Sequence, residues 1–132
     1  MDTESTHILA EFWDCKEDLN DQCLIRDHML RATHEANADP LNVFSKSFEP
    51  QGVSVLIAVS ESHLSIHTWP EKGYAAVDVF TCGKTTEPVK AIEYLREALR
   101  PRRLDIAKLN RGRKRGIGMT SFSKSGTCCR LG

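Results

Sequence analysis

One short segment, residues 61–71, concentrates most of the side chains of this chain that could do chemistry. Its sequence is Glu-Ser-His-Leu-Ser-Ile-His-Thr-Trp-Pro-Glu, which places hydroxyls, two imidazoles and two carboxylates within eleven residues. Apolar and polar residues alternate along it, and this alternation predicts a β-strand over residues 63–69. Side chains two positions apart lie on the same face of a strand, so His63, Ser65 and His67 should share one face.

These residues are compatible with more than one kind of site. A zinc site built from His63, His67 and Cys82 is disfavoured, because a strand rises about 3.3 Å per residue and separates positions four apart too widely for shared coordination. A Ser-His-Asp hydrolase is also disfavoured, since the chain has no Gly-x-Ser-x-Gly turn and the candidate serine and histidine lie on one short segment. Taken singly, each histidine could be a structural, hydrogen-bonded residue.

Self-cleavage at Ser62 fits the segment better. The Ser62 hydroxyl could attack the carbonyl carbon of Glu61 and convert that amide bond into an ester. Elimination across Cα and Cβ of Ser62 would then break the chain, and hydrolysis of the resulting enamine would leave a pyruvoyl group on the new N-terminus. Such chemistry needs a group that holds the oxyanion and a base, which Ser54 and His67 could supply if the fold brings them beside Ser62.

The elements that must position these residues form one domain. A first helix should run from Asp21 or Gln22 to about Asn37. A second should begin near Thr86-Glu87-Pro88, with Thr86 as its N-cap, and stop at Pro101. Strands are predicted over residues 7–13, 41–48, 53–59, 63–69, 75–81 and 104–109. The expected fold class is α+β, a two-layer sandwich with a mainly antiparallel sheet and two helices on one face. A second subunit is the simplest cover for the other face, which carries His and Ser.

Composition excludes several classes of partner. The formal net charge of the 132-residue chain is +0, which argues against nucleic acid as the main ligand. No apolar run approaches the roughly 20 residues needed to cross a bilayer, and the polar N-terminus predicts a cytoplasmic protein with no membrane partner. The five cysteines are an odd number in an expected reducing compartment, so no disulfide framework is predicted.

The C-terminal part, residues 113–132, is basic at first and then rich in Ser and Gly. We expect little order beyond Thr120 and assign no role to Cys128 and Cys129. The basic cluster of Arg111, Arg113, Lys114 and Arg115 is interpreted as a solvated turn or tail.

Residues 60–83 closely resemble the small prokaryotic S-adenosylmethionine decarboxylase proenzymes, and the likeness extends from about residue 7 to residue 112. The resemblance implies a pyruvoyl-dependent domain over residues 1–112 that uses neither pyridoxal phosphate nor a metal. It also implies an α/β sandwich whose αβ units dimerise sheet to sheet, with active sites at the interface. The expected substrate is S-adenosylmethionine, whose decarboxylated product supplies aminopropyl groups for spermidine.

The resemblance also implies roles in self-processing. The bond between Glu61 and Ser62 should be cleaved, which gives a β chain of residues 1–61 and an α chain of residues 62–132. Ser62 would become the pyruvoyl group, which forms a Schiff base with the substrate and acts as an electron sink on loss of CO₂. His67 and Ser54 match the residues that assist processing.

Three further residues match substrate-handling positions. Cys82 matches the acid that reprotonates the substrate carbon. Phe48 matches the aromatic residue that stacks on adenine, and Glu71 matches the carboxylate that binds the ribose hydroxyls.

The chain departs from the family pattern at several positions outside the self-processing residues. Ser5 and Thr6 precede the first-strand histidine, Val55 follows Ser54, and residues 114–115 are unusually basic. Glu49 beside Phe48 could favour a cationic side chain, so a decarboxylase of arginine or ornithine with the same pyruvoyl chemistry is one alternative. A non-catalytic regulatory homologue is the other, although the intact Ser62, His67 and Cys82 argue against it.

Overall fold

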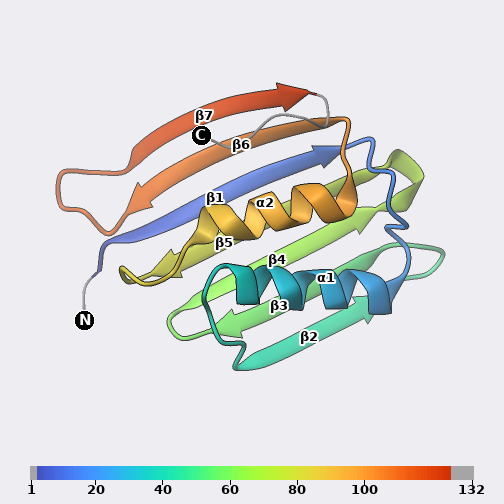
Figure 1. Ribbon diagram of the computed structural model, residues 1–132, viewed down its shortest axis with the longest axis horizontal. Helices are drawn as coiled ribbons and strands as arrows, with labels where there is room; N and C mark the ends of the chain where they lie inside the picture. Colours follow the sequence, from blue (N-terminus) through green and yellow to red (C-terminus); the bar gives the residue numbers. More distant parts are fainter. Residues whose placement is uncertain (1–2, 126–132) are drawn as a thin grey trace.

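The structure, a computed structural model, describes residues 3–125 as a single seven-stranded sheet with two helices on one face (Figure 1). The strand order is β2-β3-β4-β5-β1-β6-β7, and each neighbouring pair is antiparallel. The strands are β1 Ser5–Trp13, β2 Asn42–Ser47, β3 Val53–Val59, β4 Ser62–Trp69, β5 Tyr74–Cys82, β6 Arg103–Arg111 and β7 Gly118–Ser125. The helices are α1 Gln22–Glu35, α2 Pro88–Leu99 and a 3-10 turn, η1 Pro70–Lys72. The predicted two-layer α+β sandwich is therefore confirmed.

Helix α1 begins where the sequence predicts. The Asp21 side chain accepts a hydrogen bond of 3.0 Å from the backbone N–H of Leu24, which satisfies one free donor of the first turn. Ile25, Met29 and Ala32 are fully buried on the face that meets the sheet. The helix ends at Glu35, two residues before the predicted Asn37.

Helix α2 begins one residue later than a Thr86 cap would require, so that prediction is wrong. Glu87 occupies the N-cap position and makes no side-chain capping bond. The Thr86 hydroxyl instead donates to the carbonyl oxygen of Cys82 at 3.3 Å. The Thr86 side chain therefore ties the start of α2 back to the end of β5.

The two faces of the sheet have different environments. One face packs under the helices, with Leu64, Ile66 and Val79 fully buried. The opposite face, which we call the open face, carries His63, Ser65 and His67, as the alternation in the sequence predicts. The open face also carries exposed apolar side chains, which include Leu9 and Leu56.

Strand β7 is the main difference from the predicted fold. Residues 118–125 pair with β6 from Asn110↔Gly118 to Arg103↔Ser125, so the expectation of little order beyond Thr120 is wrong for Ser121–Ser125. Strand pairing requires only backbone groups, and the Ser- and Lys-rich composition of this segment therefore concealed it. Cys128 and Cys129 lie outside the described residues. Within residues 3–125, no helix combines the length and apolar character needed to cross a membrane.

Candidate active site

The hairpin between β3 and β4 places Ser62 directly after a strained residue. Val59 pairs with Ser62, and Ser60 and Glu61 form the turn between them. Glu61 has a φ of 58°, in the left-handed region that non-glycine residues avoid at a cost of about 1–2 kcal/mol. The strain therefore lies in the residue whose carbonyl group Ser62 would attack.

Cys82, at the end of β5, contacts both Glu61 and Ser62, the two residues joined by the peptide bond that would be cleaved. Its backbone N–H donates to the Ser62 hydroxyl oxygen at 3.0 Å, and its thiol donates to the Glu61 carbonyl oxygen at 3.3 Å. A donor on this oxygen polarises the carbonyl group and would stabilise the negative charge that develops when a nucleophile adds to it. The sequence predicted that these residues belong to one site, and the structure brings Glu61, Ser62 and Cys82 together.

A cavity of about 410 Å³ opens beside this hairpin and includes Glu61 and Cys82 in its lining. Asn37 and Leu41 contribute from the segment after α1, and Thr86 contributes from the segment before α2. The cavity gives a small molecule access to the Cys82 thiol. Cys15 is not a candidate for a reactive thiol, because burial and the nearby Asp14 carboxylate raise its pKa to about 12 and disfavour the thiolate.

Ser54 and His67 form a second group near the other end of β4. They face each other across β3 and β4, with 2.7 Å between the Ser54 hydroxyl oxygen and His67 Nδ1. A cavity of about 330 Å³ is lined by this pair together with Phe48, Trp69 and Glu71. All four residues predicted for processing assistance and nucleoside binding thus lie around one cavity.

The two groups are separated within one chain. Ser62 and His67 are five positions apart on β4, which corresponds to roughly 16 Å along a strand. The predicted self-cleavage requires Ser54 and His67 to lie beside Ser62, and within one chain they do not. The two groups of residues therefore lie at opposite ends of one strand.

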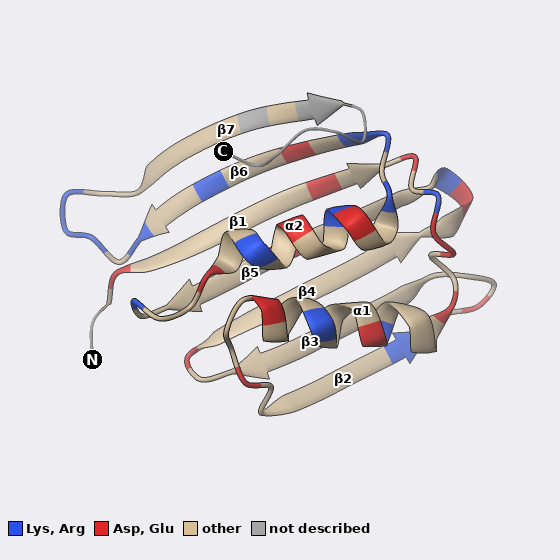
Figure 2. Ribbon diagram, viewed as in Figure 1, with Lys and Arg blue, Asp and Glu red and all other residues tan. Residues whose placement is uncertain are grey.

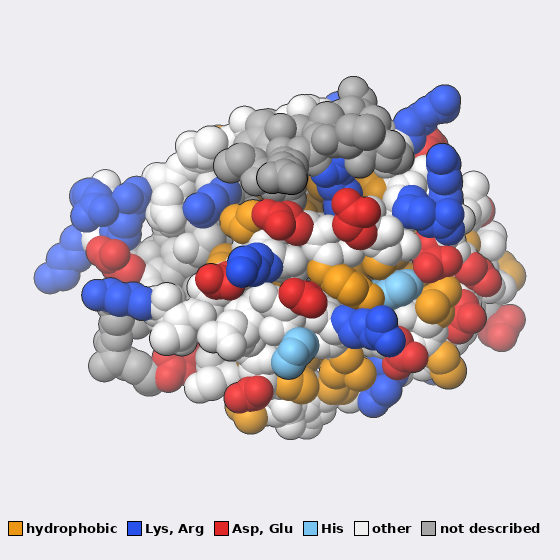
Figure 3. Space-filling model, in the orientation of Figure 1, with side chains coloured by type: hydrophobic (Ala, Val, Ile, Leu, Met, Phe, Trp, Pro, Cys, Tyr) orange, Lys and Arg blue, Asp and Glu red, His pale blue; other side chains and the backbone are white. Residues whose placement is uncertain are grey.

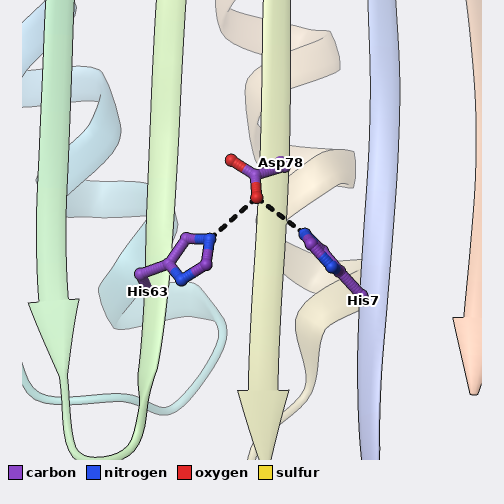
Figure 4. A group of neighbouring side chains, drawn as sticks. All are labelled: His7, His63 and Asp78. Atoms are coloured by element: carbon purple, nitrogen blue, oxygen red, sulfur yellow. Dashed lines mark hydrogen bonds and ion pairs between the residues drawn. The ribbon is translucent and has the colours of Figure 1, made fainter. Parts of the chain in front are cut away.

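A third cluster lies on the open face between β1, β4 and β5 (Figure 4). Asp78 Oδ2 is 2.7 Å from His7 Nε2 and 2.8 Å from His63 Nε2, and Ser65 donates to the other carboxylate oxygen. Burial opposes the charged form of Asp78, but the hydrogen bonds from Ser65, His7 and His63 outweigh it and hold the Asp78 pKa below its usual value. Asp78 is thus an ionised centre that three side chains stabilise.

His7, His63 and Asp78 each offer one possible metal-ligating atom, and these three atoms lie within 4.8 Å of one another. Among residues 3–125 they form the one group placed to hold a metal ion. His63, His67 and Cys82 do not form such a group. Arg111 Nη1 lies 3.1 Å from His7 Nδ1 and can only donate, so the neutral ring carries its proton on Nε2. That proton points at Asp78 and occupies the position that a metal would need.

Sequence reasoning assigned no role to three residues at these sites. Trp69 lines the same cavity as Phe48. The only feature of the sequence that could have indicated this role is an aromatic residue at the end of a predicted strand, which the structure leaves exposed. His7 and Asp78 are 71 positions apart in the chain and are brought together by the pairing of β1 with β5. No local pattern reports such a contact, although a charged residue within an otherwise apolar strand was a clue to Asp78.

Comparisons with known proteins agree with this arrangement. A family model described as S-adenosylmethionine decarboxylase matches residues 6–112. The S-adenosylmethionine decarboxylase proenzyme of Thermotoga petrophila is 44% identical over 124 residues, which cover 93% of this chain and 95% of the relative. The corresponding proenzyme of Thermosipho africanus is 46% identical with the same coverage. The crystal structure of the adenosylmethionine decarboxylase from Aquifex aeolicus matches with a TM-score of 0.73 and 34% identity, and covers 86% of this chain and 92% of that chain.

The two-layer fold is shared with a solved adenosylmethionine decarboxylase, and relatives of the chain are named as decarboxylase proenzymes. The chain belongs to the S-adenosylmethionine decarboxylase family.

Proposed function

We propose that this chain is a proenzyme that cleaves itself between Glu61 and Ser62 and then decarboxylates S-adenosylmethionine. The observation that carries the proposal is the pair of hydrogen bonds from Cys82 to the Ser62 hydroxyl oxygen and the Glu61 carbonyl oxygen. A pyruvoyl group at position 62 would supply the electron sink for loss of CO₂. The donor set fits the formation of that group, because a hydroxyl, a strained carbonyl and a donor on that carbonyl meet at one bond.

In the first step, the Ser62 hydroxyl adds to the Glu61 carbonyl carbon, and the peptide nitrogen leaves as an amine to give an ester. The Cys82 thiol stabilises the oxyanion. A base then removes the Cα proton of Ser62, and the ester bond to Cβ breaks, which releases Glu61 as a carboxylate. Water adds to the remaining enamine after tautomerisation, and ammonia leaves. The base and the second oxyanion donor in this scheme are His67 and Ser54.

Two copies of the chain, packed sheet to sheet, would bring these groups together. The roughly 16 Å between Ser62 and His67 in one chain supports a site in which one protomer supplies Ser62 and Cys82, and its partner supplies Ser54 and His67. The open face also supports this packing, because Leu9, Phe44 and Leu56 are 44%, 56% and 43% exposed on it. A second copy would cover these apolar side chains.

The substrate assignment is supported by the cavity that contains Phe48 and Glu71. Phe48 is 47% exposed and offers a ring face for stacking on adenine, while Glu71 offers acceptors for two ribose hydroxyls. Neither interaction helps to bind arginine or ornithine. Glu49, which favoured those substrates in the sequence, is exposed and does not line the cavity.

The decisive experiment is an intact-mass measurement under denaturing conditions, followed by a CO₂-release assay with labelled S-adenosylmethionine, arginine and ornithine. We expect two fragments that divide after Glu61, a pyruvoyl mass at position 62, and release from S-adenosylmethionine alone. An unbroken chain after long incubation would favour the regulatory homologue. Release from arginine or ornithine alone would keep the cleavage chemistry and overturn the substrate.

A further inference from the structure

A basic pocket of about 350 Å³ lies at the end of the sheet where β6 turns into β7. We define the basic pocket by the four cationic side chains that line it, Lys84, Arg111, Arg113 and Arg115. Glu4 is the one carboxylate in its lining. Lys and Arg colour the β6–β7 connection in Figure 2, and their side chains gather at this end of the molecule in Figure 3. Because the whole chain has a net charge of +0, this cluster is a local excess of positive charge.

Two of the arginines are held in place by contacts that, among residues 3–125, use only one of their N–H donors each. Arg111 donates one N–H to His7 Nδ1, and its guanidinium lies 4.7 Å from the centre of the Phe80 ring. Arg113 donates its Nε–H to the carbonyl oxygen of Gly116 at 3.3 Å. A guanidinium carries five N–H donors, so both side chains keep several for a ligand.

The backbone of the turn is also fixed. Gly112 has a φ of 78°, and a Cβ there would lie 1.8 Å from the carbonyl oxygen of Thr3, so the two backbones are in close contact. The Thr3 hydroxyl donates to the Gly112 carbonyl oxygen at 2.7 Å. Gly118 leaves the space that the Arg113 guanidinium occupies, since a Cβ at that position would lie 2.4 Å from Nη2. Such prior positioning lowers the entropy lost when a ligand binds.

We infer that the basic pocket binds a small phosphoryl anion. Guanidinium groups match phosphate oxygens with paired, charge-assisted hydrogen bonds, and Lys84 adds a point charge. Ser5, Thr6 and Asn110 line the same pocket and offer neutral donors. None of the residues in its lining is aromatic, so the pocket offers no platform for a nucleobase. The lining shares Gly83 with the cavity beside Cys82, but it includes none of the residues proposed for cleavage, decarboxylation or nucleoside binding. Its sequence signal was the unusually basic residues 114–115.

The test is a calorimetric titration of the purified chain with pyrophosphate, compared between two charge-matched double variants. Arg113→Gln/Arg115→Gln removes two cations from the basic pocket. Arg26→Gln/Arg31→Gln removes two cations from exposed positions on α1. We expect one binding site in the unmodified chain, affinity lowered about tenfold or more by the pocket variant, and a change below about twofold in the control. If the double variant fails to fold, Arg115→Gln alone replaces it in the titration. This single variant keeps the Arg113 contact with Gly116 and should still weaken pyrophosphate binding.

A nucleoside diphosphate provides the second arm of the experiment. ADP should bind no more tightly than pyrophosphate, because the pocket supplies contacts for phosphate alone. Tighter binding of ADP would overturn the assignment to phosphoryl groups. Absence of binding at millimolar pyrophosphate, or equal weakening by both double variants, would overturn the site itself. Neither result depends on decarboxylase activity, since binding is measured directly.

Discussion

The thiol of Cys82 lies 3.3 Å from the carbonyl oxygen of Glu61, the residue that directly precedes Ser62. The backbone N–H of Cys82 holds the Ser62 hydroxyl oxygen at 3.0 Å. One residue at the end of β5 thus contacts both the nucleophile and the electrophile. We propose from this relationship that Cys82 also takes part in chain cleavage, in addition to the proton-donor role that the sequence resemblance implies.

Ser62→Ala should abolish chain cleavage, because it removes the hydroxyl that would attack the Glu61 carbonyl carbon and that the Cys82 backbone N–H holds at 3.0 Å. Mass spectrometry under denaturing conditions should find one unbroken chain and no CO₂ release. Ser60→Ala is the matched control, since Ser60 lies on the other side of Glu61 and is exposed. Fragments from Ser62→Ala that still divide after Glu61 would rule out the ester route.

Cys82→Ala should still cleave, but about tenfold more slowly, because it removes one weak donor from the developing oxyanion. Decarboxylation by the cleaved variant should fall by roughly 10²–10⁴-fold if the thiol is the proton donor. Cleavage is followed by gel electrophoresis over time, and turnover is normalised to the cleaved fraction. Cys23→Ala, at an exposed thiol on α1, should match the unmodified chain in both assays. Normal turnover by Cys82→Ala would refute the acid assignment.

Sequence reasoning predicted much of the fold and part of the site, and the limits have physical causes. Alternation placed His63, Ser65 and His67 on one face because strand periodicity is a local property. The contact of Cys82 with Glu61 and the pairing of β7 with β6 depend on long-range strand pairing, which composition does not encode. The roughly 16 Å between Ser62 and His67 follows because β4 begins at Ser62, one residue before the predicted strand over residues 63–69.

His67→Ala and Ser62→Ala chains should complement each other if the site is shared between two copies. Each variant alone should stay largely uncleaved, since losing a general base costs roughly 10²–10⁴-fold in rate. When both are co-expressed with different tags, the His67→Ala chain keeps Ser62 and can meet the His67 that the other chain supplies. We therefore expect cleavage of the His67→Ala chain only in the mixture. If it stays intact in isolated mixed dimers, His67 does not act across the interface.

Asp78→Asn should destabilise the fold by about 2 kcal/mol near neutral pH, because it removes a carboxylate that accepts from His7, His63 and Ser65. The folded-state pKa of Asp78 is lowered from the usual 3.8, so the unfolded chain takes up the proton first as the pH falls. The stability difference between the two proteins should be full above the usual pKa and should shrink as the pH falls through the folded value. Denaturant unfolding on a Ser62→Ala background compares unbroken chains, and Asp27→Asn removes an exposed carboxylate as the control. A difference that does not shrink in acid would refute this stabilisation of the charged form.

Gly112→Ala should destabilise the chain by about 3 kcal/mol, through both backbone strain and overlap with Thr3. Gly116→Ala separates these two effects, because Gly116 has a φ of 106° in the same turn, but a Cβ there meets no atom within 4 Å. This second variant should cost only the strain, about 1 kcal/mol. Urea unfolding gives the free energy of unfolding of both variants. The difference between the two losses measures the cost of the overlap between a Cβ at position 112 and the Thr3 backbone. Equal losses from the two substitutions would mean that the Thr3 backbone moves aside, and that the arginines on either side of Gly112 are not held by this contact.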